Sequence, residues 1–254
     1  MSTILLIDIG NTRTKWARLT GAALDAQAAA PHSAWTPQTL VESILNSGGR
    51  AERVLISNVG GARIGEVARK AITTTWGIEP EFVQSTRAAG GIRNSYTEPA
   101  QLGVDRWLAM IGSRSLEQGA LCVVSVGTAM TIDGIDASGG HLGGVIVPGP
   151  DLMESSLLQN TSELAQRARQ GATSERLFAD NTLGAIRQGA EHALAALIVR
   201  SAQSMRDELG EAPRLLLTGG ACARVERAIG LTCQIVPDLV LRGLAVLAAE
   251  SGAK

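Results

Sequence analysis

The sequence predicts a duplicated α/β protein, in which two similar halves each form a mixed β-sheet covered by helices. Strand-like apolar runs alternate with helical stretches along the chain, and a strand that ends in glycine occurs at corresponding places in both halves. The composition agrees with a folded protein, because 45% of the 254 residues are hydrophobic and the net charge is −1. The high hydrophobic fraction and the small net charge exclude a disordered chain. The chain also lacks the excess of basic residues that is typical of a nucleic-acid-binding protein.

The first half begins with the apolar run from Ile4 to Ile9, which Gly10 closes, as is typical of a buried strand entering a turn. Apolar residues at helical spacing predict the helices. The expected elements are a strand over 4–10, a second strand starting within 11–17, a helix over 37–48, a strand over 54–61, a helix over 64–76, a short strand over 81–83 and a helix over 105–116.

The opening pattern returns 117 residues later, where Gly127 aligns with Gly10 and Ser125 with Asp8. The same offset matches Thr14 with Thr131. This repeat predicts two domains, 1–115 and 116–254, although chance similarity between two apolar strands is the alternative. The second half is expected to hold a strand–turn–strand over 121–133, a strand over 143–149, a helix over 182–209, and a strand with a glycine turn over 215–220.

Other features restrict the compartment and the chemistry. No apolar run approaches the roughly 20 residues of a membrane helix, and we expect no signal peptide. The three cysteines at 122, 222 and 233 have neither disulfide-framework nor zinc spacing, which suits a reducing compartment and predicts cytoplasmic residence. The histidines at 32, 141 and 192 are expected at surface or helix positions without a role. Carboxylates and glycine loops are left to carry the chemistry.

The first candidate loop follows the first strand. Asp8 can hold a divalent cation, directly or through water, and Gly10 lets the backbone approach a phosphate closely. Asn11 and Thr12 can donate hydrogen bonds to phosphate oxygens, and Lys15 adds a positive charge. The structural alternative is a β-hairpin with a polar turn. The spacing is not that of a Walker A loop.

Two more glycine loops lie in the second half. Gly127-Thr128 could hold another part of a triphosphate, and Gly219-Gly220 could let a base or ribose lie on the backbone. Each also has a purely structural interpretation, as a hairpin turn and as a tight strand-to-helix turn.

The segment from Tyr96 to Arg106 carries the remaining candidates, including the only tyrosine of the chain. Asp105 is a candidate general base that takes a proton from an alcohol, and Arg106 could clamp an anionic group. Since Asp105 lies where a helix is expected to start, a capping role is the alternative.

Together these motifs resemble those of the type III pantothenate kinases, in the right order over nearly the whole chain. The segment Gly-Val-Asp-Arg-Trp between the two phosphate loops is the most specific. The residues that carry the resemblance are Asp8-x-Gly10-Asn11-Thr12-x-x-Lys15, Tyr96-x-x-Pro99, Leu102-Gly103-Val104-Asp105-Arg106-Trp107, Gly127-Thr128-Ala129-x-Thr131-x-Asp133, Gly143-Gly144-x-Ile146-x-Pro148-Gly149, Asn181-Thr182 and Thr218-Gly219-Gly220.

The resemblance implies an actin-like, ribonuclease H-like fold of two similar domains with ATP in the cleft between them. It implies ATP-dependent phosphorylation of the primary hydroxyl of pantothenate, which gives 4′-phosphopantothenate and opens coenzyme A synthesis. It further implies a homodimer with pantothenate near the dimer interface, a requirement for Mg²⁺ with ATP, and a requirement for K⁺ or NH₄⁺.

The resemblance also assigns roles to matching positions. Asp105 becomes the catalytic base, and Asp8 becomes a ligand of Mg²⁺. The implied ATP-binding residues are Asp8, Ile9, Gly10, Asn11, Thr12, Arg13, Thr14, Lys15, Gly127, Thr128, Gly219 and Gly220; the implied pantothenate-binding residues are Tyr96, Gly103, Val104, Asp105, Arg106 and Thr182.

One position departs from the family pattern. Ser125 stands where the family usually has an aspartate that is associated with the monovalent cation, and a neutral hydroxyl cannot offset the charge of a cation. Three outcomes follow: the cation requirement is weakened, rebuilt from other ligands, or lost. With this substitution the chain also resembles relatives described as accessory factors for virulence gene regulation. A regulatory protein, and a kinase of the same fold for another small alcohol, are therefore the competing hypotheses.

Overall fold

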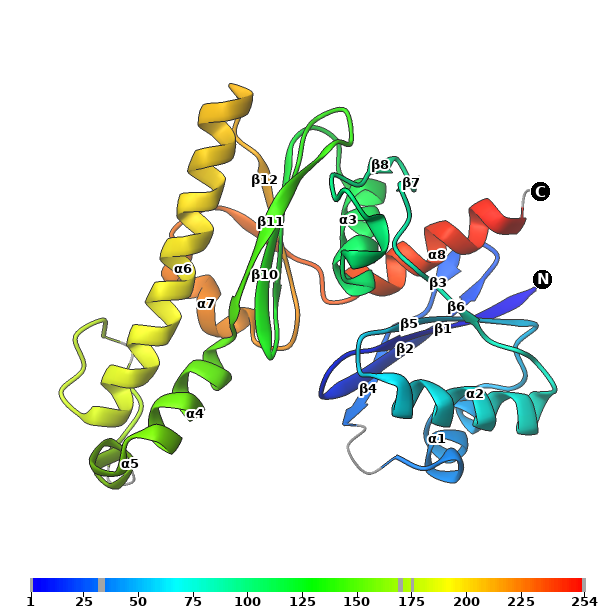
Figure 1. Cartoon of the computed structure of the whole chain (residues 1–254), viewed down its shortest axis with the longest axis horizontal. Coiled ribbons are helices and arrows are strands. Elements are labelled where there is room, and N and C mark those ends of the chain that lie inside the picture. The colour runs from blue at the N-terminus through cyan, green and yellow to red at the C-terminus, as the bar shows by residue number, and fades with distance from the viewer. Residues whose placement is uncertain (1, 32–34, 169–170, 175, 253–254) are drawn as a thin grey trace. The chain divides into compact units, whose positions relative to one another are not determined.

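The computed structural model describes residues 2–31, 35–168, 171–174 and 176–252, which form two units (Figure 1). The first unit contains the chain up to Gln118, the short segment Gly139–His141, and the chain from Asp238 onward. The second contains Gly119–Ser138 and Leu142–Pro237. Each unit has its own mixed β-sheet with helices packed on it, so the predicted α/β class is confirmed.

The first sheet is built around β1 (Thr3–Ile9), which pairs antiparallel with β2 (Arg13–Thr20) and parallel with β5 (Arg53–Asn58). The strand order is β3-β2-β1-β5-β6, and β4 also pairs with β2. The shorter strands of this sheet are β3 (Ala23–Leu24), β4 (Ala28–Pro31) and β6 (Glu81–Phe82). A separate hairpin is formed by β7 (Ala88–Ala89) and β8 (Ile92–Arg93).

Helices cover both faces of the first sheet, because successive side chains of β1 point to opposite sides. Leu5 and Ile7 belong to the core under α1 (Pro37–Ser43) and α2 (Ala62–Trp76), whereas Leu6 belongs to the core under α3 (Val104–Leu116) and α8 (Leu239–Gly252) (Figure 1). The helix expected over 37–48 is shorter: α1 ends at Ser43, and a 3₁₀ turn follows at Leu45–Ser47. A second 3₁₀ turn lies at Pro99–Gln101.

Two glycines bring α3 and α8 into close contact. A Cβ on Gly112 would lie 2.1 Å from the carbonyl oxygen of Leu239, and a Cβ on Gly243 would lie 2.1 Å from that of Leu108. Since neither position has room for a side chain, the backbones of the two helices approach directly. This contact fixes the C-terminal helix on the first unit.

The second sheet repeats the plan of the first. Its central strand β9 (Leu121–Val126) pairs antiparallel with β10 (Ala129–Ile135) and parallel with β12 (Arg214–Thr218). The order is β11-β10-β9-β12-β13, where β11 is His141–Pro148 and β13 is Cys233–Ile235. The predicted duplication is therefore confirmed at the level of strand order and direction.

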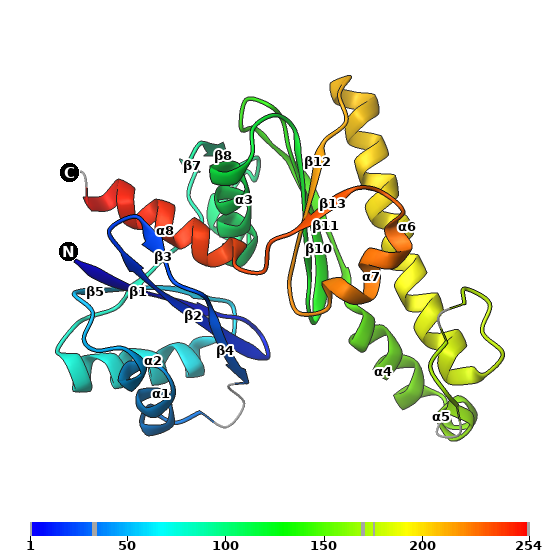
Figure 2. The same ribbon diagram turned by 180° about the vertical axis from the view of Figure 1, so that it is seen from behind.

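Helices α6 (Thr182–Leu209) and α7 (Cys222–Ile229) pack on the face of the second sheet that carries Cys122, Val124 and Val126 (Figure 2). The remaining helices of this unit are α4 (Pro150–Asn160) and α5 (Ser162–Ala168). None of the helices within the described ranges is both long and apolar enough to cross a membrane.

The turns of the two central hairpins differ in length. The backbone N–H of Gly10 donates to the carbonyl of Arg13, whereas that of Gly127 donates to the carbonyl of Ala129, both at 3.0 Å. The second turn is therefore one residue shorter, and Thr131 lies opposite Ser125 as Lys15 lies opposite Asp8. The predicted match of Thr14 with Thr131 is wrong, because a constant sequence offset cannot follow the change in turn length.

Candidate active site

Asp8 lies near the carboxyl end of the central strand of the first sheet. The register places Lys15 of β2 on one side of it and Ser57 of β5 on the other. The residue is 8% exposed and stands between two fully buried isoleucines, Ile7 and Ile9. A buried carboxylate thus sits at the edge where ligands of open α/β sheets bind.

Burial and neighbouring charges together set the protonation of Asp8. Burial raises its pKa from 3.8 to about 6; Lys15 lowers the pKa, the charge of Asp105 raises it, and Ser57 lowers it slightly. The Oδ1 atom of Asp8 is buried without a hydrogen-bond partner among the described residues. Such an oxygen suits Mg²⁺, which binds through one or two carboxylates and otherwise keeps water and phosphate ligands.

Asp105 occupies the first turn of α3, with Gly103 at the N-cap. Its Oδ1 accepts the backbone N–H of Arg106 at 2.9 Å, and a Cβ on Gly103 would lie 2.8 Å from this oxygen. The absence of a side chain at 103 therefore makes room for the carboxylate, and the helix dipole stabilises its charge. The charge of Asp105 raises the pKa of Asp8, so the two carboxylates lie within electrostatic range of each other.

The first predicted phosphate loop is a tight turn with an exposed tip. Asn11 and Thr12 are exposed at the tip, while Thr14 is fully buried in β2. Gly60 packs against the base of the turn, since a Cβ there would lie 2.6 Å from the carbonyl oxygen of Gly10. The turn therefore presents short polar side chains and backbone groups on a fixed support.

Tyr96 and Arg106 form the second predicted group of this unit. Arg106 is buried, and its Nη1 donates to the Tyr96 hydroxyl at 3.1 Å. The side chain of Arg87 holds the backbone beside them, since it donates to the carbonyls of Tyr96 and Thr97, both at 2.8 Å. The segment before α3 is thus braced by side chains, although it has little regular secondary structure.

His141 contradicts its predicted surface or helix position. It is 5% exposed at the start of β11, and its ring stacks on Tyr96 with centroids 6.0 Å apart and planes inclined by 11°. Its Nδ1 lies 3.1 Å from the Ser95 hydroxyl. Nothing in the sequence links His141 to Tyr96, which lies 45 positions earlier. His192 lies on α6, as expected, and His32 lies outside the described residues.

The second predicted loop belongs to the second unit, where Gly149 supports it. The N–H of Gly149 donates to the carbonyl of Thr128 at 2.8 Å, and a Cβ on Gly149 would overlap the carbonyl oxygen of Gly127. Gly219 has a positive φ of 100°, and a Cβ there would lie 2.3 Å from the carbonyl oxygen of Val126. Gly220, by contrast, has open space around it.

Ser125 and Thr182 also belong to the second unit. Ser125 lies in the middle of the sheet, with Thr131 and Thr218 opposite it on the two neighbouring strands. Three hydroxyl side chains therefore share one row at this position. Thr182 is the first residue of α6, directly after Asn181, whose side chain caps the helix by accepting the N–H of Gly184 at 2.9 Å.

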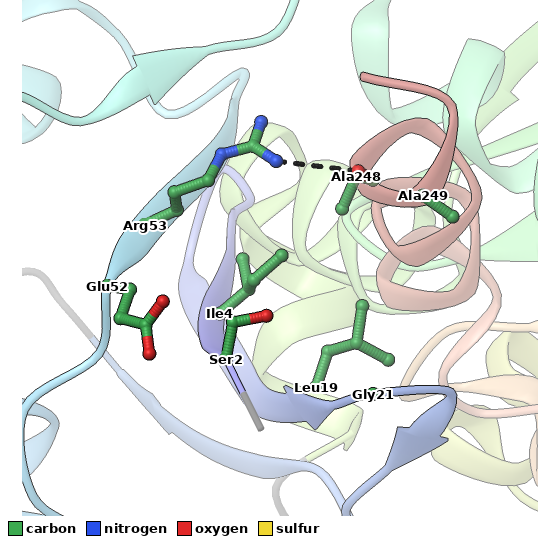
Figure 3. Close-up of a pocket in the computed structure, with 8 residues that line it drawn as sticks. All are labelled: Ser2, Ile4, Leu19, Gly21, Glu52, Arg53, Ala248 and Ala249. Atoms are coloured by element: carbon green, nitrogen blue, oxygen red, sulfur yellow. Dashed lines mark hydrogen bonds between the residues drawn. The ribbon is translucent and has the colours of Figure 1, made fainter. Parts of the chain in front are cut away.

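A pocket of about 490 Å³ in the first unit lies away from Asp8 (Figure 3). Ser2 and Ile4 of its lining come from the amino end of β1, whereas Asp8 lies at the carboxyl end. Arg53 borders it and donates to the carbonyl of Ala248 at 3.4 Å. We assign no part of the predicted site to this pocket.

Comparison with known sequences gives one consistent result. The family description "Type III pantothenate kinase" matches residues 4–204. A protein of this name from Nitrosococcus oceani is 35% identical over 253 residues, which cover 98% of this chain and 94% of the relative. Another from Azoarcus sp. strain BH72 is 41% identical over 250 residues, which cover 98% and 92%.

Solved structures show the same fold at lower identity. A Baf family protein from Campylobacter jejuni, described as a transcriptional activator, is 21% identical with a TM-score of 0.61 over 98% of this chain and all of that one. Component A of the (R)-2-hydroxyglutaryl-CoA dehydratase from Acidaminococcus fermentans is 13% identical with a TM-score of 0.58 over the full length of both. These likenesses carry the fold alone, and they confirm the predicted actin-like class.

Proposed function

The chain belongs to the type III pantothenate kinase family, and from this premise we propose how its residues perform the reaction of the family. That reaction is the ATP-dependent phosphorylation of pantothenate in coenzyme A biosynthesis. The observation that supports our assignment of residues is the buried Asp8 carboxyl at the carboxyl end of β1, with Lys15 opposite it in the sheet and the charge of Asp105 near enough to raise its pKa.

Asp105 is the proposed general base. Its carboxylate accepts the proton of the primary hydroxyl of pantothenate while the hydroxyl oxygen bonds to the γ-phosphorus of ATP. The bond between the γ-phosphorus and the bridging oxygen breaks, and ADP leaves. The hydrogen bond from the N–H of Arg106 to Oδ1 fixes the orientation of the carboxylate before substrate arrives.

The phosphate groups of ATP are the proposed ligands of the glycine turns. In the first unit, residues 8–15 offer the backbone of Gly10, the side chains of Asn11 and Thr12, and the charge of Lys15. In the second unit, we assign Gly127 and Thr128 to ATP phosphates and Gly219 with Gly220 to the nucleoside. Asp8 is the proposed Mg²⁺ ligand, and Mg²⁺ supplies neutralisation of phosphate charge.

Pantothenate is the proposed ligand of Tyr96, the run from Gly103 to Arg106, and Thr182. The buried Arg106 supports this assignment, because a guanidinium held by a tyrosine hydroxyl is positioned to pair with a carboxylate. Burial also strengthens that pairing, because less water screens it.

The monovalent cation, the assembly and the compartment are also proposals. The hydroxyl row at Ser125 fits K⁺ or NH₄⁺ poorly, because it offers oxygen ligands without a charge at this position, so we propose a weakened cation requirement. Ile146 on β11 is 61% exposed and Phe178 is 85% exposed, which supports a homodimer that covers them. Sedimentation of the purified protein measures the assembly. We propose cytoplasmic residence, where coenzyme A is used.

The variant Asp105→Asn tests the proposed base. We expect kcat to fall on the order of 10²- to 10⁴-fold, because the amide cannot accept the proton, with a small change in the KM for ATP. A coupled assay of ADP release with pantothenate, ATP and Mg²⁺ measures both constants. Arg167→Gln, which removes an exposed ion pair on α5, is the control. Near wild-type turnover in Asp105→Asn at saturating ATP contradicts the assignment.

A further inference from the structure

A chain of three side chains runs from His141 to Arg106. The imidazole of His141 lies in an offset stack on the Tyr96 ring, and the Tyr96 hydroxyl accepts the Arg106 Nη1 hydrogen bond at 3.1 Å. The guanidinium carbon of Arg106 lies 5.8 Å from the centre of the same ring. Tyr96 is therefore held on its ring and at its hydroxyl by two buried side chains.

The position of His141 is itself fixed by its surroundings. Its Nδ1 lies 3.1 Å from the Ser95 hydroxyl, next to Tyr96 in the chain. Its backbone is held by the preceding residues, since Gly140 forms a bridge with Arg93 and Gly139 accepts the N–H of Arg93 at 2.8 Å. A Cβ on Gly139 would overlap the carbonyl oxygen of Gly91, so the two segments touch closely. The imidazole is thus a fixed support.

We propose that His141 is a positioning residue of the pantothenate site. It keeps the Tyr96 ring in the orientation in which the tyrosine hydroxyl meets Arg106, so that both side chains are in place before pantothenate binds. This inference rests on the proposed function, because Tyr96 and Arg106 are substrate residues only under that proposal. His141 itself takes no part in proton transfer.

The physical reason is the freedom of a tyrosine side chain. Without a partner on its face, the Tyr96 ring can leave the orientation that suits Arg106, and binding of pantothenate must then restore it. The stacked imidazole of His141 removes this free-energy cost, because it orders the Tyr96 ring before pantothenate binds. The face of the ring carries the effect, so an aromatic replacement at 141 retains it and a small aliphatic replacement loses it.

Kinetics of His141→Ala and His141→Phe provide the first test. We expect His141→Ala to raise the KM for pantothenate roughly 3- to 10-fold, while kcat and the KM for ATP stay within about twofold of wild type. His141→Phe should restore most of the loss. His192→Ala, a histidine of the second unit, is the control. A drop in kcat with equal changes in both KM values indicates a general structural role and overturns the proposal.

The single tyrosine of the chain gives a second readout that needs no activity. Protein labelled with 3-fluorotyrosine has one ¹⁹F resonance, which reports on Tyr96 alone. We expect that resonance to shift and move toward the free amino acid in His141→Ala, and to stay close to wild type in His141→Phe. An unchanged resonance in His141→Ala overturns the proposal. If His141→Ala does not fold, His141→Leu, which fills more of the space without an aromatic face, gives the same comparison with His141→Phe.

These readouts separate a failure of the proposed function from a failure of the positioning role. If the wild-type enzyme does not phosphorylate pantothenate, the proposed function fails, whereas the ¹⁹F shift still shows whether His141 holds Tyr96. If the resonance shifts in His141→Ala while the KM for pantothenate is unchanged, the ring is held but does not serve the substrate, and the positioning role is wrong.

Discussion

The two central hairpins share a backbone plan and differ in charge. In both, the N–H of the glycine that ends the strand donates across the turn at 3.0 Å, and the strand is flanked by one antiparallel and one parallel neighbour. The position two residues before the glycine is Asp8 in the first unit and Ser125 in the second. The repeated fold thus provides two equivalent places, and the side chains decide that a carboxylate stands in only one of them.

The flanking residues follow the same division. Asp8 has the cation of Lys15 opposite it, whereas Ser125 has the neutral Thr131, since the shorter turn brings that residue into register. A buried carboxylate costs free energy that a nearby cation partly offsets, while a hydroxyl needs no such partner. The first hairpin therefore bears an energetic cost that the second does not.

Replacement of the Asp8 carboxylate is expected to have the largest effect on activity. We expect Asp8→Asn to lower kcat/KM roughly 10²- to 10³-fold, because the amide keeps the shape of the side chain and loses the charge that serves Mg²⁺ and the phosphates. Titration of activity with Mg²⁺ should show a shift to higher metal concentration. The equivalent change in the second hairpin, Ser125→Ala, should cost less than about tenfold. Equal losses in the two variants contradict the contrast between the hairpins.

The pKa of Asp8 predicts a pH dependence of stability that the second hairpin lacks. Because burial raises this pKa from 3.8 to about 6, the folded protein binds a proton that the unfolded chain releases. The contribution of Asp8 therefore favours folding below about pH 4 and is lost as the pH rises through about 6. The loss is on the order of 3 kcal/mol.

Urea unfolding at pH 4 to 7 measures this dependence. The free energy of unfolding of wild type should fall relative to that of Asp8→Asn as the pH rises, since asparagine does not titrate. Ser125→Ala should follow wild type over the whole range. Parallel curves for wild type and Asp8→Asn would show that the carboxyl does not titrate in this window.

Much of this comparison could be predicted from local sequence. The apolar run of β1 and the glycine after it identify the first hairpin, and the same pattern identifies the second, because buried strands and glycine turns leave short-range signals. The segment 103–106 stands out by its residue types. The structure then places the Asp105 charge close enough to act on Asp8, an interaction that separate motifs could only suggest.

Other features depend on distant contacts and leave no such signal. The equivalence of Lys15 and Thr131 depends on turn length, which backbone hydrogen bonds reveal. The packing of α8 on α3 depends on Gly112 and Gly243, whose contacts on the other helix lie more than 100 residues away in the sequence. The stacking of His141 on Tyr96 joins the first residue of β11 to a loop. In each case the free energy comes from tertiary packing rather than from local periodicity.

The reverse substitution, in the second hairpin, has the smallest expected effect on activity. Ser125→Asp places a carboxylate in the second hairpin at the position equivalent to Asp8, where the family resemblance places the group that serves the monovalent cation. We expect stimulation by K⁺ over Na⁺ to increase severalfold relative to wild type, because the new charge offsets that of the cation. The change in kcat at saturating K⁺ should stay within about threefold. Ser125→Asn, which matches the shape without the charge, is the control. If Ser125→Asp and Ser125→Asn respond equally to K⁺, charge at this position does not control the cation requirement.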